Sequence, residues 1–509
     1  MIYTVDKKKI ANNTIALYLR MGLTMVIGFY MTRIMLVQLG SEDYGLNNLV
    51  GSIVSLMGFI NSSMGTAVQR FFSLELGKDE GNSNNMGKIF STGLYLHILV
   101  ALISFVVAEF FALFFLERLN IPSERLYAAH IVFQISVVSM FIGIVTVPYF
   151  SLLRAREMFS KMALYDIIQA VLRLTVVIIL AYSRYDKLIL LSFLNFGVTL
   201  CYTYIMVKMA LEFREAHNRP SRNPVLIKQM LSFVSLLTLT VLSNLINTKG
   251  IVVLVNLFYG LLVNAAFAVA IQVQNVVSTF VMNFKQSIVP QMMSAYGAGD
   301  LLTMHKLITI GTKITFLLML MVSLPIVFEV DFLLNLWLKT PPTYTSSLVV
   351  LTIININISS FTYFLYQGVH ATGNISGQQI WISISYVLGI LLTYMAFIFN
   401  YSFYSALIVA MIISFLQCII NVVFSRLKYR YSISCFLHLS SRCLLTTLIT
   451  SVMIFVIDDN MSGGWMRLAT VTLSSLLLVA VLGFVFVLNK DEKNAIKNYL
   501  PNNKIFSLL

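Results

Sequence analysis

Apolar stretches of about twenty residues recur along almost the whole chain, separated by short polar segments. A helix of about 20 residues crosses the hydrocarbon core of a bilayer and satisfies its own backbone hydrogen bonds there. With 58% hydrophobic and 11% charged residues, a chain of 509 residues lacks the polar surface that a soluble protein needs. We therefore predict an all-α integral membrane protein with about fourteen transmembrane helices.

The predicted spans are distributed from the first residues to the carboxyl-terminal tail. In chain order they are residues 13–36, 44–66, 89–116, 126–150, 163–182, 188–207, 231–257, 261–284, 307–328, 348–368, 380–399, 402–424, 444–457 and 468–488. The basic segment 212–224 separates the first six spans from the rest.

Basic residues are distributed unevenly between the loops. If the amino terminus is cytoplasmic, 24 of the 35 Lys and Arg residues fall on the cytoplasmic side, 6 fall in outer loops, and the rest lie in or near helices. Cytoplasmic loops of membrane proteins are enriched in this way. The net charge of +14 therefore needs no nucleic-acid partner. The pattern predicts a multi-pass protein with both termini in the cytoplasm.

The sequence shows no sign of a cleaved signal, a disulfide or a metal site. Arg20 and Arg33 interrupt the first apolar stretch, and no small-residue cleavage site follows it, so we expect this stretch to be retained as a helix. The cysteines lie in predicted helices or on the cytoplasmic side without metal-ligand spacing. They are Cys201, Cys418, Cys435 and Cys443.

Similar residues recur at an offset of about 222 positions, which indicates an internal repeat. Gln69 corresponds to Gln291, and Gly40 corresponds to Gly260. Each copy contains six helices, an even number, so both copies enter the membrane in the same orientation, as in parallel repeats. We predict two six-helix lobes, residues 1–216 and 217–430. Residues 431–509 add two transmembrane helices and a cytoplasmic tail.

Polar residues form stripes on the equivalent second helices of both lobes and on the helix that opens the second lobe. Spacings of three and four residues place them on one helical face. Such residues also hydrogen-bond between packed helices, and this alternative stays open for each helix. Their occurrence in both lobes favours a hydrated cavity. The candidate lining residues are Asn48, Ser55, Asn244, Asn247, Gln272 and Asn275.

Cations inside predicted spans are a sharper signal, because a Lys or Arg at the bilayer centre costs about 2.5 to 3.5 kcal/mol. Arg173 lies near the middle of its predicted helix, and Asp166 on the same face is about 10 Å away along the axis, too far for pairing. Arg173, Arg20 and Lys249 are the candidates for binding an anionic substrate. The alternatives are a partner for Arg173 on another helix, and a headgroup position for Arg20.

No constellation of catalytic residues is recognisable. The six histidines show no HExxH pair, and Asp458-Asp459 lacks the second acidic pair of a metal-diphosphate site. The polar segment from Gly81 to Lys88 has the wrong glycine spacing for a phosphate-binding loop. We therefore predict that the protein is not an enzyme, and we expect no cofactor and no metal.

The chain combines two predicted six-helix lobes, two further helices and three sequence segments typical of one family. The segments are the turn from Gly40 to Gly45 and the stretches from Gln69 to Lys78 and from Pro290 to Asp300. With these features the chain resembles the polysaccharide (Wzx-type) flippases of the multidrug, oligosaccharidyl-lipid and polysaccharide exporter superfamily. The resemblance extends over nearly the whole chain. The stretch from Asn256 to Ala266 resembles the bacterial polysaccharide branch in particular.

The resemblance implies alternating-access transport of polyprenyl-diphosphate-linked oligosaccharide repeat units across the bacterial inner membrane, for O-antigen or capsule synthesis. The implied partners are this lipid-linked oligosaccharide, membrane lipids, a coupling cation such as H⁺ or Na⁺, and other polysaccharide assembly proteins. A cation-coupled exporter of drugs or small solutes and a membrane-embedded transferase are the alternatives. Such drug exporters often carry an acidic residue in the first helix, where this chain has Arg20 and Arg33.

Overall fold

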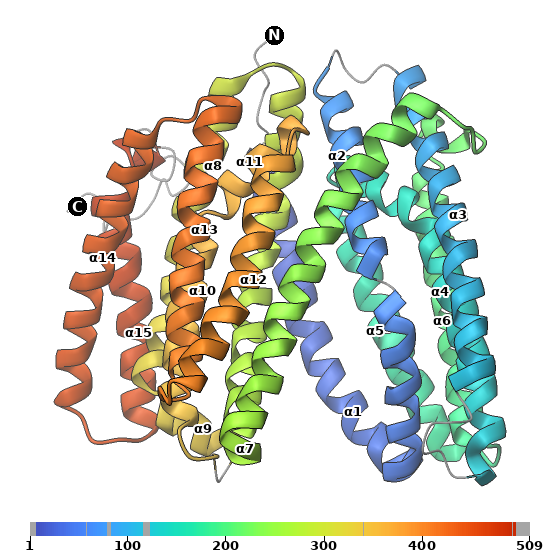
Figure 1. Cartoon of the computed structure of the whole chain (residues 1–509), viewed down its shortest axis with the longest axis horizontal. Coiled ribbons are helices and arrows are strands. Elements are labelled where there is room, and N and C mark those ends of the chain that lie inside the picture. The colour runs from blue at the N-terminus through green and yellow to red at the C-terminus, as the bar shows by residue number, and fades with distance from the viewer. Residues whose placement is uncertain are drawn as a thin grey trace. The chain divides into compact units, whose positions relative to one another are not determined.

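The computed structural model describes residues 7–57, 59–78, 83–115, 123–338, 341–490 and 492–494, and helices make up nearly all of them (Figure 1). The α-helices are α1 (Lys7–Met57), α2 (Phe59–Leu76), α3 (Ser83–Phe115), α4 (Leu126–Ala155), α5 (Phe159–Tyr182), α6 (Lys187–Ala210), α7 (Pro224–Gly297), α8 (Leu301–Phe328), α9 (Val330–Leu338), α10 (Thr345–Phe361), α11 (Tyr363–Thr372), α12 (Ser376–Ile398), α13 (Ser405–Tyr429), α14 (Ile433–Asp459) and α15 (Trp465–Leu482). Short turns η2 (Ser123–Arg125) and η3 (Arg214–His217) precede α4 and α7, and a π-helical turn, η4 (Gly483–Val487), follows α15.

Among the described residues, 12 helical segments are long and apolar enough to cross a membrane. They run from Asn84–Phe110 to Trp465–Val487 and correspond to the last twelve predicted spans. The first two predicted spans lie on α1 and α2, so the count of fourteen stays a prediction. The prediction of an all-α membrane protein is confirmed.

The outer faces of the helices are apolar, as lipid contact requires. On α14, Leu444, Leu448, Val452 and Phe455 are all exposed and follow one another at helical spacing. The opposite face buries Cys443 and other side chains in the protein. Such an exposed stripe is unfavourable in water and favourable in lipid.

The helices form two compact units. Unit 1 comprises Met1–Thr238 and Gln286–Asp300, and unit 2 comprises Leu239–Lys285 and Leu301–Leu509. The long helix α7 therefore contributes its two ends to unit 1 and its middle to unit 2. The predicted boundaries at residues 216 and 430 stay a prediction.

Two glycines interrupt the longest helices. Gly40 in α1 has φ 76° and ψ 176°, and Gly260 in α7 has φ 78° and ψ −173°. This region of backbone space is essentially restricted to glycine, because a Cβ would clash there. These are two of the residues that the predicted repeat pairs. They share one conformation, while the repeat and the arrangement of two lobes stay predictions.

In unit 1, α4 packs against α2, α3 and α6, and α5 packs against α1 and α6. Phe133 and Val137 of α4, Val177 and Leu180 of α5, and Leu191 of α6 belong to its largest buried cluster. In Figure 1, α3, α4 and α6 lie side by side within this unit.

Charged groups fasten the ends of several unit 1 helices. Asp186 is the N-cap of α6, where its carboxylate accepts hydrogen bonds from the N–H groups of Leu188 and Ile189. The Arg125 guanidinium donates to Asp186 over 2.6 Å and to Asp43 of α1 over 2.7 Å. Burial acts to raise the pKa of Asp186, but the Ile189 N–H and the Arg125 guanidinium together hold it below its usual value. These contacts join α1, just after its Gly40 bend, to the first residues of α4 and α6.

The carboxyl-terminal end of α7 is held in unit 1 by hydrogen bonds and by close backbone packing. Gln291 donates to the Glu157 carboxylate over 2.9 Å, and Ser294 donates to the Ser73 carbonyl over 2.8 Å. A Cβ at Gly77 would lie 1.8 Å from the Ser294 carbonyl oxygen, and a Cβ at Gly297 would lie 2.1 Å from the Leu74 carbonyl oxygen. Each glycine therefore permits the other segment's backbone to approach.

We expect Gly77→Ala to reduce the free energy of unfolding by about 1 to 3 kcal/mol, because the methyl group must displace a backbone carbonyl. Thermal unfolding of the purified protein in detergent measures the effect. Gly143→Ala on α4 is the matched control, because a Cβ there meets nothing within 4 Å. Equal stability of the two variants would show that Gly77 and Ser294 do not approach this closely.

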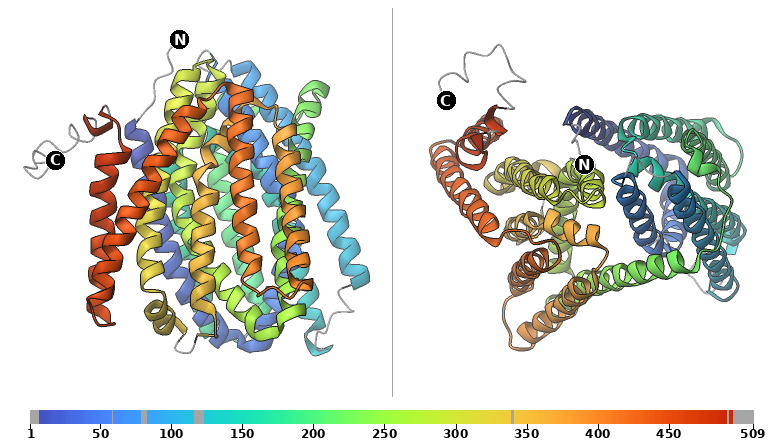
Figure 2. Two further views of the ribbon diagram at one scale, coloured as in Figure 1. Left: turned by 60° about the vertical axis from the view of Figure 1, so that its left-hand side comes forward. Right: turned by 90° about the horizontal axis from the view of Figure 1, so that it is seen from above.

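In unit 2, α13 packs against α10, α11 and α12, and α8 packs against α10, α14 and α15. Leu348, Ile353 and Phe397 lie in its largest buried cluster. The last two long helices, α14 and α15, are in contact and lie side by side in Figure 2. Leu439 and Cys443 of α14 form a smaller buried cluster with Val487 of η4.

Candidate functional site

A polar cluster in unit 1 is centred on Asp166 of α5. The Arg20 guanidinium on α1 donates to its Oδ2 over 2.8 Å, and the Tyr202 hydroxyl on α6 donates to its Oδ1. The Arg20 and Asp166 side chains are 27% and 22% exposed, so the pair is accessible rather than sealed in the core. Three helices thus converge on one carboxylate.

Two further arginines extend this cluster. Arg154 at the end of α4 interacts electrostatically with Asp166, Tyr202 and Arg20. Arg173 lies seven residues after Asp166 on α5, close enough to Tyr202 for the two side chains to influence each other's ionisation. We refer to Arg20, Arg154, Asp166, Arg173 and Tyr202 as the cationic cluster. Three guanidinium groups and one carboxylate give it an excess of positive charge.

Arg173 is incompletely satisfied within the part of the chain that the structure describes. Its Nε atom is buried and has no hydrogen-bond partner there. No acidic side chain among the described residues forms an ion pair with it, and Asp166 pairs with Arg20 instead. A buried guanidinium N–H without a partner is unfavourable, and an anionic ligand would remove that cost.

The cluster contains two of the three cations that the sequence singled out, Arg20 and Arg173, and their role in binding a substrate stays a prediction. Asp166 does not pair with Arg173, as the spacing predicted. Arg20 was given a headgroup position as its alternative, but its guanidinium binds Asp166. Arg154 and Tyr202 were not singled out. The sequence signal for Arg154 was weak, because an arginine at the predicted cytoplasmic end of a helix is common.

The predicted polar residues of unit 2 have different environments. Asn247 of α7 donates from Nδ2 to the Tyr386 carbonyl of α12 over 2.7 Å, which is a hydrogen bond between packed helices. Four other candidates have exposed side chains, which form no hydrogen bond with any described residue. They are Asn244, Lys249, Gln272 and Asn275. Their role in lining a cavity stays a prediction.

Asn48 and Ser55 lie on the backbone of α1, between Gly40 and the end of that helix. Their side chains fall outside what the structure describes, and so does the side chain of Arg33. The stripe that these residues form in the sequence stays a prediction.

Unit 2 also buries polar side chains, and two of them, Lys285 and Gln379, were not singled out in the sequence. Lys285 of α7 is 6% exposed and lies over the Tyr363 ring, 4.5 Å from its centroid. Gln379 of α12 accepts a hydrogen bond from Thr240 of α7 over 2.6 Å and contacts His370 of α11 over 2.8 Å. The span predicted from the sequence, residues 261–284, ends one residue before Lys285. The helix continues to Gly297.

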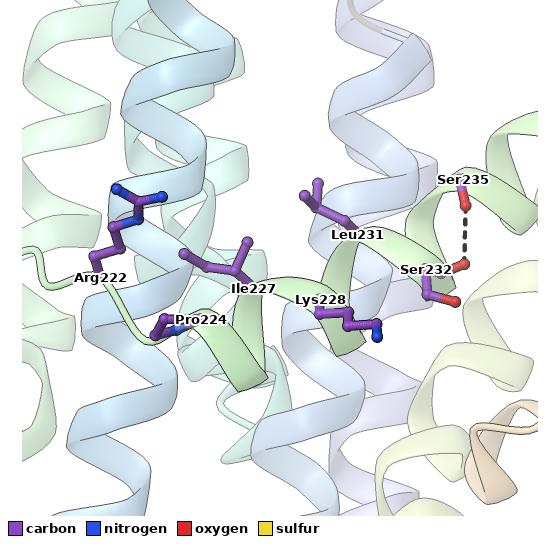
Figure 3. Close-up of a pocket in the computed structure, with 7 residues that line it drawn as sticks. All are labelled: Arg222, Pro224, Ile227, Lys228, Leu231, Ser232 and Ser235. Atoms are coloured by element: carbon purple, nitrogen blue, oxygen red, sulfur yellow. Dashed lines mark hydrogen bonds between the residues drawn. The ribbon is translucent and has the colours of Figure 1, made fainter.

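The first turns of α7 line a surface groove of unit 1 of about 600 Å³ (Figure 3). Arg222 and Lys228 provide its positive charge, and Ile227 and Leu231 provide apolar walls. The groove is wide open, and Ser232 and Ser235 at its far end are joined by a hydrogen bond. It is separate in sequence from the cationic cluster.

The chain has the MATE fold of a polytopic membrane protein. Solved structures share this fold at low sequence identity. "MATE in the bent conformation" matches with a TM-score of 0.72 at 14% identity, covering 84% of this chain and 96% of that one. An outward-facing "multidrug resistance MATE family transporter of the MOP superfamily" matches with a TM-score of 0.69 at 12% identity, covering 84% and 97%.

A MOP superfamily transporter from Pyrococcus furiosus also matches, with a TM-score of 0.64 at 12% identity, covering 84% of this chain and 97% of that one. Residues 19–179 match the MatE family model. That segment contains Arg20, Arg154, Asp166 and Arg173 of the cationic cluster. No curated protein sequence matches the chain significantly.

Proposed function

We propose that this protein is a transporter that moves polyprenyl-diphosphate-linked oligosaccharides from the cytoplasmic to the outer leaflet of the bacterial inner membrane. The observation that carries the proposal is the cationic cluster, in which the buried Arg173 Nε has no partner among the described residues. A diphosphate supplies two negatively charged groups with several acceptor oxygens for such guanidinium groups. The fold and the segment match support a transporter of the MATE type.

The electrostatics of the cluster favour an anionic substrate over a cationic drug. Its one carboxylate, Asp166, is already bound by Arg20 and Tyr202. An incoming cation would meet three guanidinium groups and no available carboxylate within the cluster. For the Pyrococcus furiosus protein, a binding pocket of reverse polarity has been taken to suggest a different function. We take a change of pocket polarity as the basis for a change of substrate in this fold.

The sugar part of the substrate requires hydrogen-bonding groups rather than charge. We assign this role to the polar residues of the predicted stripes, with Gln272 and Asn275 as the accessible members on α7. Both side chains are exposed and carry amide groups, which donate and accept hydrogen bonds. Alternating access between the two lobes, driven by H⁺ or Na⁺, remains part of the proposal.

Reconstitution of the purified protein into vesicles tests the substrate class. A fluorescent polyprenyl-diphosphate oligosaccharide placed in one leaflet should become accessible in the other leaflet faster than in protein-free vesicles. The monophosphate analogue is the matched control, and it should move more slowly because it offers fewer acceptors to the arginines. The proposal fails if the labelled lipid stays in place while a cationic dye is transported.

A further inference from the structure

A basic groove of about 420 Å³ lies between α14 and the segment that follows α15 in unit 2. Arg442 of α14, Lys490 and Lys493 supply three cations to its lining, and Val485 and Leu488 supply apolar surface. Arg442 is about 14 Å from the start of α14 at 1.5 Å per residue, so the groove lies near one end of the helix pair. The distribution of basic residues predicts that this end faces the cytoplasm.

The segment after α15 is held in place by a buried ion pair. Glu492 accepts hydrogen bonds from Lys313 Nζ of α8 at 3.0 and 2.8 Å, and from the Asn489 N–H at 2.7 Å. The Lys313 side chain is 4% exposed. Lys493 is fixed by donating to the Val485 carbonyl over 2.9 Å. Arg442 is therefore carried on α14, while Lys493 and the neighbouring Glu492 are fixed by contacts with η4 and α8.

The charge of the groove is not compensated within the described part of the chain. Lys313 already binds Glu492, the one described acidic residue of this segment. Arg442 and Lys490 form no ion pair with any described residue. Cations grouped between transmembrane helices on the cytoplasmic side are suited to the phosphate of an anionic lipid, whose acyl chains would follow the apolar surface.

We propose that this groove binds the headgroup phosphate of an anionic membrane lipid, with Arg442 and Lys490 as its principal contacts. The apolar wall distinguishes a lipid from free phosphate, because Val485 is 39% exposed beside the cations and would contact an acyl chain. The lipid would cover the junction of α14 and η4. This site is distinct from the cationic cluster and does not depend on the proposed substrate.

Native mass spectrometry of the purified full-length protein tests the site. It compares the binding of phosphatidylglycerol with that of phosphatidylcholine. The wild type should bind phosphatidylglycerol more tightly. Each basic residue near the headgroups contributes about fivefold in affinity, so Arg442→Gln with Lys490→Gln should weaken phosphatidylglycerol binding by about thirtyfold. Arg426→Gln with Lys428→Gln on α13 removes the same charge outside the groove and should change the affinity by less than about threefold.

Two results would overturn the assignment. The first is equal weakening by the groove variant and by the α13 control, because binding would then depend on net charge alone. The second is displacement of the lipid by inorganic phosphate at millimolar concentration, which would make free phosphate the ligand. Lys490→Gln alone, at an exposed position, should weaken binding about fivefold without affecting the fold.

Discussion

Replacing Lys313 by alanine is expected to reduce the free energy of unfolding by about 3 to 5 kcal/mol. Lys313 belongs to α8, and its side chain is almost fully buried in the protein. Its ammonium group donates two hydrogen bonds to the Glu492 carboxylate. Removing it leaves the Glu492 carboxylate largely buried without its cation, and desolvation of an uncompensated charge is costly. The loss should first release the segment after α15 from α8 and then weaken the contact of α15 with α8.

Thermal and dodecyl sulfate-induced unfolding of the purified protein measure this effect. Lys306→Ala provides the control, since Lys306 is exposed on the same helix. Replacing both partners, as Lys313→Met with Glu492→Leu, should recover most of the stability, because no charge then remains buried. If Lys313→Ala unfolds together with the wild type, the ion pair does not hold the carboxyl-terminal segment.

The transmembrane segments were predictable because hydrophobicity along a span is a local property of the sequence. Spans such as 126–150 and 188–207 correspond closely to α4 and α6. Helix ends were less predictable, because a helix that extends beyond the membrane has no hydrophobic boundary. Lys285 shows the consequence: it lies inside α7 and is buried, although its sequence neighbourhood suggested a cytoplasmic loop.

The cationic cluster was predictable only in part, because it depends on contacts between helices that are distant in sequence. Arg173 was recognisable from its depth in a predicted span. The pairing of Arg20 with Asp166 required knowledge that α1 packs against α5, which one sequence does not contain. Asn247 shows the opposite difficulty: a polar residue on a predicted stripe hydrogen-bonds to a neighbouring helix.

Arg173→Ala is expected to lower transport by about ten- to hundredfold, because charge-assisted hydrogen bonds contribute about 1.5 to 3 kcal/mol each. The buried Nε of Arg173 has no described partner, so its hydrogen bond is available for a diphosphate oxygen. Arg173→Lys keeps the charge but lacks the planar, forked donors of a guanidinium, and it should retain part of the activity. Arg184→Ala, at an exposed position between α5 and α6, should leave transport unchanged.

The most direct test of the central claim is to measure surface polysaccharide production. The protein is expressed in a bacterial strain that lacks its own transporter for the lipid-linked repeat unit. Each variant is compared with the wild type at equal membrane levels. The cationic cluster predicts normal production with Arg184→Ala, intermediate production with Arg173→Lys and little production with Arg173→Ala. Normal production by a well-expressed Arg173→Ala variant would contradict the account and leave Arg173 as a structural residue.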